Sequence, residues 1–438
     1  MIHQYKKIIQ LAFPVILANA SVPLLGLADT AMIGQTGLAA DLGAIALATL
    51  VFSFVYWAFG FLRMGTTGFI AQASSKQDKE ELHALLFRSI LLGLIIGLVL
   101  IICQKLIGQT AMLLLGASQE IKLLVADYFY IRIWGAPATL ITFSLLGAFI
   151  GMGWTRHLLW TQLFLNGLNI VLNLLFVVKL DMGVKGIALG TVCAEWVCLF
   201  FAFYLILKKF GISHPVARIK TLWSAIINKR KLIALMKVNS DIMIRTLALI
   251  SGFAWFANQG AKFGDHTLAS NHVLLQFVSL SAFFLDGFAH VVEMLAGRAY
   301  GAKNKTLFVK EVKHSTILAG LCALILSVLI YGLANQLIPL LSKDVQIQAL
   351  ASDHVLYAAF YILISFAAFQ LDGIFIGVTR STEMRNATLI SLAVFLAAAI
   401  PLSSYYSNAG LWMAFILFVL VRALSLGLYY PRILKYMD

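Results

Sequence analysis

Six carboxylic acids stand within long apolar stretches of the sequence, namely Asp29, Glu195, Asp241, Asp286, Glu293 and Asp372. If these stretches cross a membrane, an ionised side chain near the bilayer centre costs at least ~2.5 to 3.5 kcal/mol. Side chains retained at such a cost usually mark ion or substrate pathways. The candidates for functional chemistry are therefore these acids and three accompanying cations, Arg63, Arg245 and Arg422.

Three polar residues of the second half follow helical spacing. Asp286, His290 and Glu293 lie at i, i+4 and i+7, which places them in one stripe along a helix. Two acids on one dry face repel each other, so at least one of them favours its protonated form. The stripe predicts a proton-handling site, and a satisfied structural network is the competing interpretation.

The same half contains an acid and a base four residues apart. Asp241 and Arg245 are expected to share a helical face and to neutralise each other as a structural ion pair. Together with the stripe and with Asp372, this pair makes up the expected polar site of the second half.

Asp29 has no basic neighbour within its own apolar stretch, so its compensation must come from another helix or from an ion. Asn169 and Asn173 are spaced i and i+4, and their amide oxygens share a face that could bind a hard cation together with Asp29. Thr191 could add a hydroxyl. These four residues are the expected coupling site of the first half and a possible Na⁺ site. The alternative is that the amides of Asn169 and Asn173 only hold neighbouring helices together by hydrogen bonds.

The rest of the chain indicates that these stretches lie in a membrane. Of 438 residues, 61% are hydrophobic and only 12% are charged, whereas about 25% of the residues of a soluble protein are charged. The four cysteines stand singly, which predicts neither a disulfide framework nor a zinc site. The formal charge of +14 comes largely from short loops, where membrane topology explains it better than nucleic-acid binding. We expect an all-α integral membrane protein.

Apolar runs between charged, Gly-marked or Pro-marked breaks predict twelve transmembrane helices, because a bilayer core of ~30 Å needs roughly 20 apolar residues per crossing. The first half is expected to cross at 8–34, 44–72, 82–104, 121–150, 157–179 and 184–207. The second half is expected to cross at 232–258, 266–297, 309–332, 346–377, 386–403 and 409–429.

Basic residues predict the orientation of these helices. With the N-terminus in the cytoplasm, the inward-facing segments hold 21 Lys and Arg and the outward loops hold five, and such an excess marks the cytoplasmic side. Seven of the 21 lie between Lys208 and Lys231. We expect a multi-pass protein of the cell inner (cytoplasmic) membrane with both termini cytoplasmic. Its expected parts are an N-lobe of 1–209, a basic linker of 210–231 that faces membrane lipid, and a C-lobe of 232–438.

The two halves repeat at an offset of 226 residues. Gly147-Ala148-Phe149-Ile150-Gly151 aligns with Gly373-Ile374-Phe375-Ile376-Gly377, and Ala71-Gln72-Ala73 aligns with Gly297-Arg298-Ala299 in the same register. Six crossings per half give both halves one orientation, so they are expected to be related by a pseudo-twofold axis along the membrane normal. Such a duplication with a cavity between the lobes is typical of transporters.

Five sequence blocks resemble the multidrug and toxic compound extrusion (MATE) family, and most closely its DNA-damage-inducible protein F (DinF) branch. The resemblance covers nearly the whole chain. The blocks begin or centre on Pro23-Leu24-Leu25-Gly26-Leu27-Ala28-Asp29, Phe61-Leu62-Arg63-Met64-Gly65, Asp241-Ile242-Met243-Ile244-Arg245, Leu285-Asp286-Gly287-Phe288-Ala289, and Leu371-Asp372-Gly373 with Thr379-Arg380-Ser381-Thr382-Glu383.

The resemblance implies two six-helix lobes, alternating access to a central cavity, and export of organic compounds driven by inward flow of protons or sodium. The family's first-lobe cation site matches Asp29, Asn169 and Thr191, and its second-lobe acid matches Asp372. This chain has Asn173 where the family commonly has an acid. Asp29 is then the only acid of the first-lobe site, so proton coupling is favoured over sodium coupling.

The expected function is thus a cation-coupled antiporter that exports amphipathic, cationic or zwitterionic organic compounds. A flippase for lipid or lipid-linked substrates is the alternative within the same superfamily. No P-loop, HExxH or GxSxG motif is present, so an enzyme is not expected. No cofactor other than the coupling H⁺ or Na⁺ is expected, and the protein is expected to be a monomer.

Overall fold

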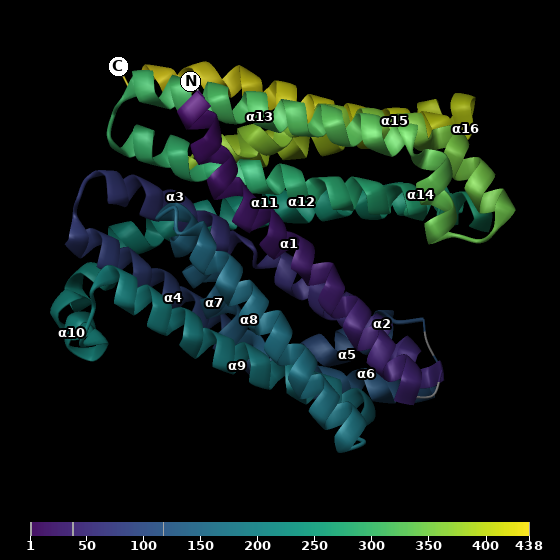
Figure 1. Ribbon diagram of the computed structural model, residues 1–438, viewed down its shortest axis with the longest axis horizontal. Coiled ribbons are helices and arrows are strands. Elements are labelled where there is room, and N and C mark those ends of the chain that lie inside the picture. Colours follow the sequence, from purple (N-terminus) through teal and green to yellow (C-terminus); the bar gives the residue numbers. More distant parts are fainter. Residues whose placement is uncertain (1, 37–38, 117, 438) are drawn as a thin grey trace. The chain divides into compact units, whose positions relative to one another are not determined.

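The computed structural model describes residues 2–36, 39–116 and 118–437, and every regular element within these residues is a helix (Figure 1). The first half contains α1 (Ile2–Thr36), α2 (Ala39–Ala58), α3 (Phe61–Ser75), α4 (Lys79–Ile102), α5 (Gln104–Leu114), α6 (Gln119–Arg132), α7 (Ala136–Gly151), α8 (Thr155–Asn173) and α9 (Gly183–Phe210). A 3₁₀ turn, Ile133–Gly135, joins α6 to α7, and a π-helical stretch, Leu174–Lys179, continues α8.

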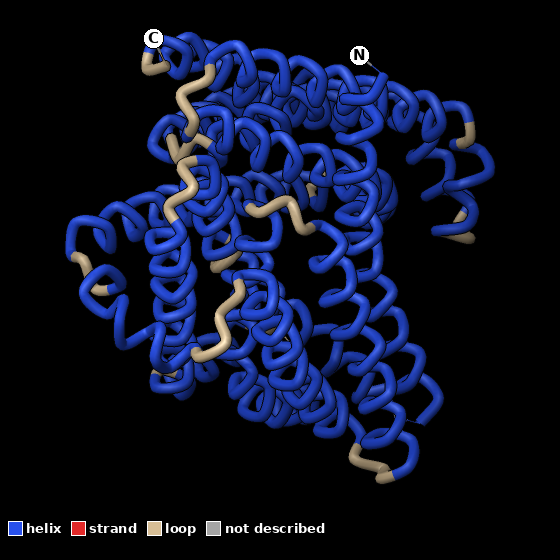
Figure 2. The backbone as a smooth tube through the Cα atoms, turned by 60° about the vertical axis from the view of Figure 1, so that its left-hand side comes forward, coloured by secondary structure: helices blue, strands red, loops and turns tan. Residues whose placement is uncertain are grey.

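The second half contains α10 (Pro215–Ile226), α11 (Lys229–Ala261), α12 (Asp265–Gly301), α13 (Lys305–Gly332), α14 (Ala334–Leu341), α15 (Val345–Gly377) and α16 (Ser381–Lys435). Short loops connect most helices (Figure 2). Local chemistry explains several helix ends. Asp344 caps α15 by accepting hydrogen bonds from the amides of Gln346 and Ile347, and Gly211 ends α9 in the left-handed conformation.

The helix α16 consists of two helical pieces, because Ser407 has non-helical dihedral angles, φ 50° and ψ −131°. This break falls between the two last crossings expected from the sequence. Across the break, a Cβ at Gly410 would meet the carbonyl of Leu402. Only glycine allows the two pieces to approach so closely.

Within the residues that the structure describes, nine helical segments are long and apolar enough to cross a membrane. They are Asp41–Ser75, Lys79–Ile102, Gln119–Gly151, Thr155–Lys179, Gly183–Phe210, Asp265–Gly301, Lys305–Gly332, Val345–Gly377 and Ser381–Lys435. The expected all-α fold is therefore confirmed for the described residues, and these segments have the length and composition of membrane crossings.

The chain forms two compact units. The N-terminal unit comprises Leu17–Ile70 and Gln77–Leu235, and the C-terminal unit comprises Met1–Ile16, Ala71–Lys76 and Met236–Asp438. The start of α1 therefore belongs to the C-terminal unit, whereas the start of α11 belongs to the N-terminal unit.

In the N-terminal unit, α4 packs on α7, α8 packs on α9, and α6 packs on both α2 and α9. The linker helix α10 packs on α4 through Leu222 and Ile226. Arg88 of α4 donates hydrogen bonds to the carbonyls of Ile226, at 3.0 Å, and Ala225, at 2.6 Å. These bonds attach the linker to the helical bundle.

In the C-terminal unit, α15 packs on α12, α13 and α16. One apolar cluster of this unit contains a group of aromatic rings in which Phe415 lies 4.5 Å from Phe256 and 4.8 Å from Tyr361, centroid to centroid. A second cluster includes Ile8 and Ala12 of α1, packed against α12 and α13. The first turns of α1 thus contribute to this core.

The helices α3 and α7 cross at two glycines. A Cβ at Gly147 would meet the carbonyl of Arg63, and one at Gly151 would lie 2.8 Å from the carbonyl of Thr67. Small residues at such crossings let helix backbones approach within a membrane.

The helices α12 and α15 repeat this crossing. A Cβ at Gly373 would lie 2.5 Å from the carbonyl of Ala289, and one at Gly377 would meet the carbonyl of Glu293. All four residues follow their counterparts in α3 and α7 by 226 positions, so the predicted repeat register is found in the packing.

Candidate functional site

The structure brings Asp29 together with both asparagines. The amide nitrogen Nδ2 of Asn173 lies 2.7 Å from Asp29 Oδ1 and 2.7 Å from Asn169 Oδ1. It therefore donates to both oxygens. Asn169 and Asn173 are fully buried, whereas Asp29 is half-buried. The hydrogen-bond partner of this carboxylate among the described residues is thus an amide.

The asparagines also carry polar atoms without partners. Among the described residues, neither Asn169 Nδ2 nor Asn173 Oδ1 has a hydrogen-bond partner. Buried amides of this kind are normally satisfied. A Cβ at Gly190 would collide with Asn173 Oδ1, so this oxygen faces α9, away from Asp29.

A third asparagine on α8 was not predicted. Asn166 Nδ2 donates to the hydroxyl of Ser21 at 2.8 Å and to its carbonyl at 3.1 Å. Asn166, Asn169 and Asn173 follow i, i+3, i+7 spacing, which could have revealed one amide stripe facing α1. The stripe ends where α8 changes to its π-helical stretch at Leu174, and such irregularities frequently occur at functional sites.

Thr191 makes a different contact from the one that was expected. Its hydroxyl donates to the carbonyl of Ile187 within α9 at 2.8 Å. Gly190, the preceding residue, is the one that packs against Asn173. The described contacts therefore bring Asp29, Asn169 and Asn173 together but do not add Thr191.

A buried ion pair, missed in the sequence, lies in the same unit. Arg132 Nη1 donates to Glu195 Oε2 at 2.6 Å, and Nη2 donates to Oε1. Both side chains are 8% exposed. The guanidinium carbon also lies 5.3 Å from the ring centroids of Phe52 and Tyr56. Arg132 and Glu195 lie in separate predicted crossings and have opposite signs, which could have suggested this pair.

The expected ion pair between Asp241 and Arg245 is wrong. Asp241 Oδ1 accepts a hydrogen bond from Arg385 at 2.6 Å, and its Oδ2 accepts from Ser381 and Thr382 at 2.9 and 2.8 Å. All three donors lie in the first turns of α16, which satisfy both carboxylate oxygens.

Arg245 instead pairs with the buried Asp372 of α15, donating from Nη2 to Oδ2. Arg422 Nη2 lies 4.0 Å from the same oxygen. The second-lobe acid is therefore flanked by two guanidinium groups.

The stripe on α12 faces the bundle interior. His290 and Glu293 are 7% and 1% exposed, and Asp286 is half-buried. The carbonyl of Glu293 lies against Gly377 of α15. Proton handling by this stripe stays a prediction.

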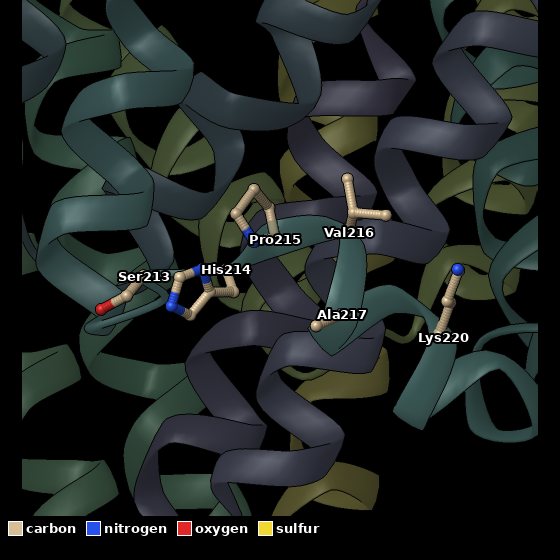
Figure 3. Close-up of a pocket in the computed structure, with 6 residues that line it drawn as sticks. All are labelled: Ser213, His214, Pro215, Val216, Ala217 and Lys220. Carbon is tan, nitrogen blue, oxygen red and sulfur yellow. The ribbon is translucent and has the colours of Figure 1, made fainter.

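A surface hollow of about 410 Å³ lies where the linker enters α10. It is lined by Ser213, His214, Pro215, Val216, Ala217 and Lys220 (Figure 3). None of the acids considered above lines it, so this hollow is separate from the candidate coupling site.

Comparisons with known proteins agree with this architecture. The MatE family model matches residues 14–175 and 242–403. DNA damage-inducible protein F of Escherichia coli K12 is 35% identical over 430 residues, which cover 98% of this chain and 92% of the relative. A probable multidrug resistance protein NorM of Thermotoga maritima is 25% identical over 350 residues, covering 78% and 73% of the two chains.

Solved structures show the same fold. The MATE transporter VcmN of Vibrio cholerae in its bent form superposes with a TM-score of 0.88 at 18% identity, covering 99% of this chain and 98% of that one. A MOP superfamily transporter of Pyrococcus furiosus gives a TM-score of 0.85 at 19% identity, covering 99% and 96%. With two matched repeats, a full-length relative at 35% identity and this shared fold, the chain belongs to the MatE family of membrane transporters, not to a family of enzymes.

Proposed function

We propose that this protein is a proton-coupled antiporter that exports amphipathic, cationic or zwitterionic organic compounds by alternating access. Membership of the MatE family and the resemblance to a probable multidrug resistance protein support export of such compounds. The polar cluster around Asp29 supports the choice of the coupling ion.

The proposed architecture has twelve crossings in two six-helix lobes. The nine apolar segments become ten when Ser381–Lys435 is divided at Ser407. The long helices α1 and α11 supply the remaining two. The glycine crossings at the common offset of 226 residues support a pseudo-twofold axis along the membrane normal.

The proposed lobes are 1–209 and 232–438, with 210–231 as the cytoplasmic linker. Both termini face the cytoplasm, and the protein acts as a monomer in the inner membrane. The basic linker and its helix α10 support this topology, because basic residues accumulate on the cytoplasmic side.

The position of the Asn173 amide group is the observation that favours a proton over a sodium ion as the coupling ion. A sodium ion at Asp29 would require surrounding oxygens, yet Asn173 directs its N–H donor at Asp29 and its oxygen towards α9. The Nδ2 atom occupies the space between the two oxygens that a cation would bridge. A carboxyl oxygen accepts this N–H bond whether or not the other oxygen carries a proton.

Coupling follows from competition for one acid. A proton and a cationic compound cannot both neutralise Asp29, so protonation from outside favours release of the compound, and loss of the proton to the cytoplasm restores the site. The prolines at 14 and 23 allow α1 to bend as the charge on Asp29 changes.

We predict that Asp29→Asn reduces gradient-driven export to the rate of protein-free liposomes, because it removes the exchangeable proton and keeps the shape of the side chain. The measurement is efflux of a fluorescent organic cation from proteoliposomes. The matched control is Asp127→Asn, since Asp127 is 47% exposed and pairs with Lys185 at 3.3 Å. Export should survive the control, and undiminished export by Asp29→Asn would refute the proposed site.

The same vesicles separate the two coupling ions. A pH gradient imposed alone should drive export, and a sodium gradient imposed alone, with pH clamped on both sides, should not. If a sodium gradient alone drove export, the coupling ion proposed for the Asp29 cluster would have to be Na⁺ instead of the proton.

A further inference from the structure

Two arginines share one carboxylate in the core of the C-terminal unit. Arg245 of α11 donates to Asp372 Oδ2, and Arg422 Nη2 of α16 lies 4.0 Å from that oxygen. All three side chains are buried: Arg245 is 9% exposed, Asp372 is 7% exposed and Arg422 is 8% exposed. One carboxylate neutralises one guanidinium, so this trio carries one positive charge in excess.

Arg422 has a buried N–H donor that the described residues leave unpaired. Across the part of the chain that the structure describes, its Nε is buried without a partner, and its nearest acidic oxygen is beyond hydrogen-bond distance. A guanidinium has five N–H donors, and burying them unsatisfied is costly.

Two other buried arginines, Arg88 and Arg132, use their guanidinium groups in hydrogen bonds. Arg88 bonds to two carbonyls and lies near Glu81, and Arg132 forms two bonds with Glu195. Arg422 and Arg245 differ from these two, because the Nε donor of each is buried without a partner among the described residues.

We propose that Arg422, with Arg245 beside it, receives the carboxylate of the transported compound. A guanidinium binds a carboxylate through two parallel N–H bonds, which would satisfy the donors of Arg422 and cancel the excess charge. This inference rests on the proposed export function and narrows its substrate class to amphipathic compounds that carry a carboxylate.

The second oxygen of Asp372 fits a zwitterion. Asp372 Oδ1 is buried and has no hydrogen-bond partner among the described residues. This oxygen could therefore accept a hydrogen bond from a donor group of the compound, such as an amine. A compound that bears both a carboxylate and an amine therefore complements both sides of the cluster.

The test is equilibrium binding of two fluorescent probes to the purified full-length protein in detergent. One probe is a rhodamine with a free carboxylate, and the other is the methyl ester of the same dye. Wild type should bind the acid roughly ten-fold more tightly than the ester, as expected for hydrogen bonds to a charged group. Arg422→Gln should abolish this preference by weakening binding of the acid, and Arg422→Lys should retain part of it.

The matched control is Arg432→Gln, which removes the same charge from the same helix at an arginine whose described contact is the ring of Tyr429. This variant should keep the wild-type preference. The proposal would be overturned if wild type bound both dyes equally or bound neither of them. It would also be overturned if Arg422→Gln kept the wild-type preference for the acid.

Thermal unfolding without any dye gives an independent readout. A residue kept for ligand binding costs stability in the empty protein, so Arg422→Gln should melt at or above the wild-type temperature. A lower melting temperature would assign Arg422 a structural role instead. Neither measurement uses an ion gradient, so failure of Asp29 to couple export would leave these results unaffected, and failure here would leave the Asp29 experiment unaffected.

Discussion

At the scale of residues, each buried charge is best understood through partners on other helices. Asp241 illustrates this rule, because its three described donors all lie in the first turns of α16. Helical spacing showed that Asp241 and Arg245 could share a face. It could not show that Arg385 would satisfy Asp241 and leave Arg245 for Asp372.

The sequence predicted part of the first-half cluster for a physical reason. An acid alone in an apolar stretch needs a polar partner, and two asparagines at i and i+4 present a polar face. Asp29 and Asn173 do meet. The orientation of the Asn173 amide could not be predicted, because it depends on the packing of Gly190 in α9 against the amide oxygen.

The Arg132–Glu195 pair gives a prediction at this scale. Glu195→Gln should lower the free energy of unfolding by about 3 to 5 kcal/mol, because it leaves the buried guanidinium without its counter-charge. Denaturant titration of the purified protein measures the change. Asp127→Asn, at an exposed pair, should cost less than about 1 kcal/mol.

The double variant Arg132→Gln with Glu195→Gln is the second control. It removes both charges, so it should recover part of the stability lost in Glu195→Gln. An unfolding free energy of Glu195→Gln equal to that of wild type would show that the pair is not needed for the fold.

At the scale of elements, apolar runs predicted the long helices because each run must satisfy its own backbone within the membrane. The short helices α5, α10 and α14 were not predicted. They are 11, 12 and 8 residues long, so they lack the extended apolar run that reveals a crossing. The π-helical stretch after Asn173 was not predicted either, because its composition does not differ from that of an apolar α-helix.

The crossing of α12 and α15 gives a prediction at this scale. Gly373→Ala should destabilise the protein by about 1 to 3 kcal/mol, because the new methyl would lie 2.5 Å from the carbonyl of Ala289 and force the helices apart. The measurement is the shift in the denaturant midpoint.

Gly427→Ala is its control, since a Cβ at Gly427 in α16 meets nothing within 4 Å. Alanine is the better helix former, so this variant should be neutral or more stable by up to about 1 kcal/mol. Equal effects of the two substitutions would contradict the role assigned to the crossing.

At the scale of the whole molecule, the two halves share the glycine crossings between helices but not the polar residues of the candidate sites. The glycine crossings recur at the offset of 226 residues, but the counterparts of Asp29 and Asn173 are Trp255 and Ala399. The counterpart of Asp372 is Leu146. The sequence could predict the duplicated scaffold from its glycines, whereas the separate polar clusters had to be located in the structure.

The division of the chain into units gives a prediction at this scale. We expect residues 228–438, expressed alone, to lack a cooperative melting transition, because Ile8 and Ala12 are missing from the core with α12 and α13. Coexpression with residues 1–227 should restore it and yield a complex that copurifies. A cooperative transition of 228–438 alone at the temperature of the complex would contradict this expectation.

The reciprocal assignment of α1 and α11 carries an evolutionary consequence. Met1–Ile16 completes the unit built mainly from the second repeat, and the start of α11 belongs to the unit built mainly from the first. A single repeat by itself would lack the segment that completes its unit, so we expect that an ancestor with one repeat could complete that unit only by pairing with a second copy that supplied its own first helix.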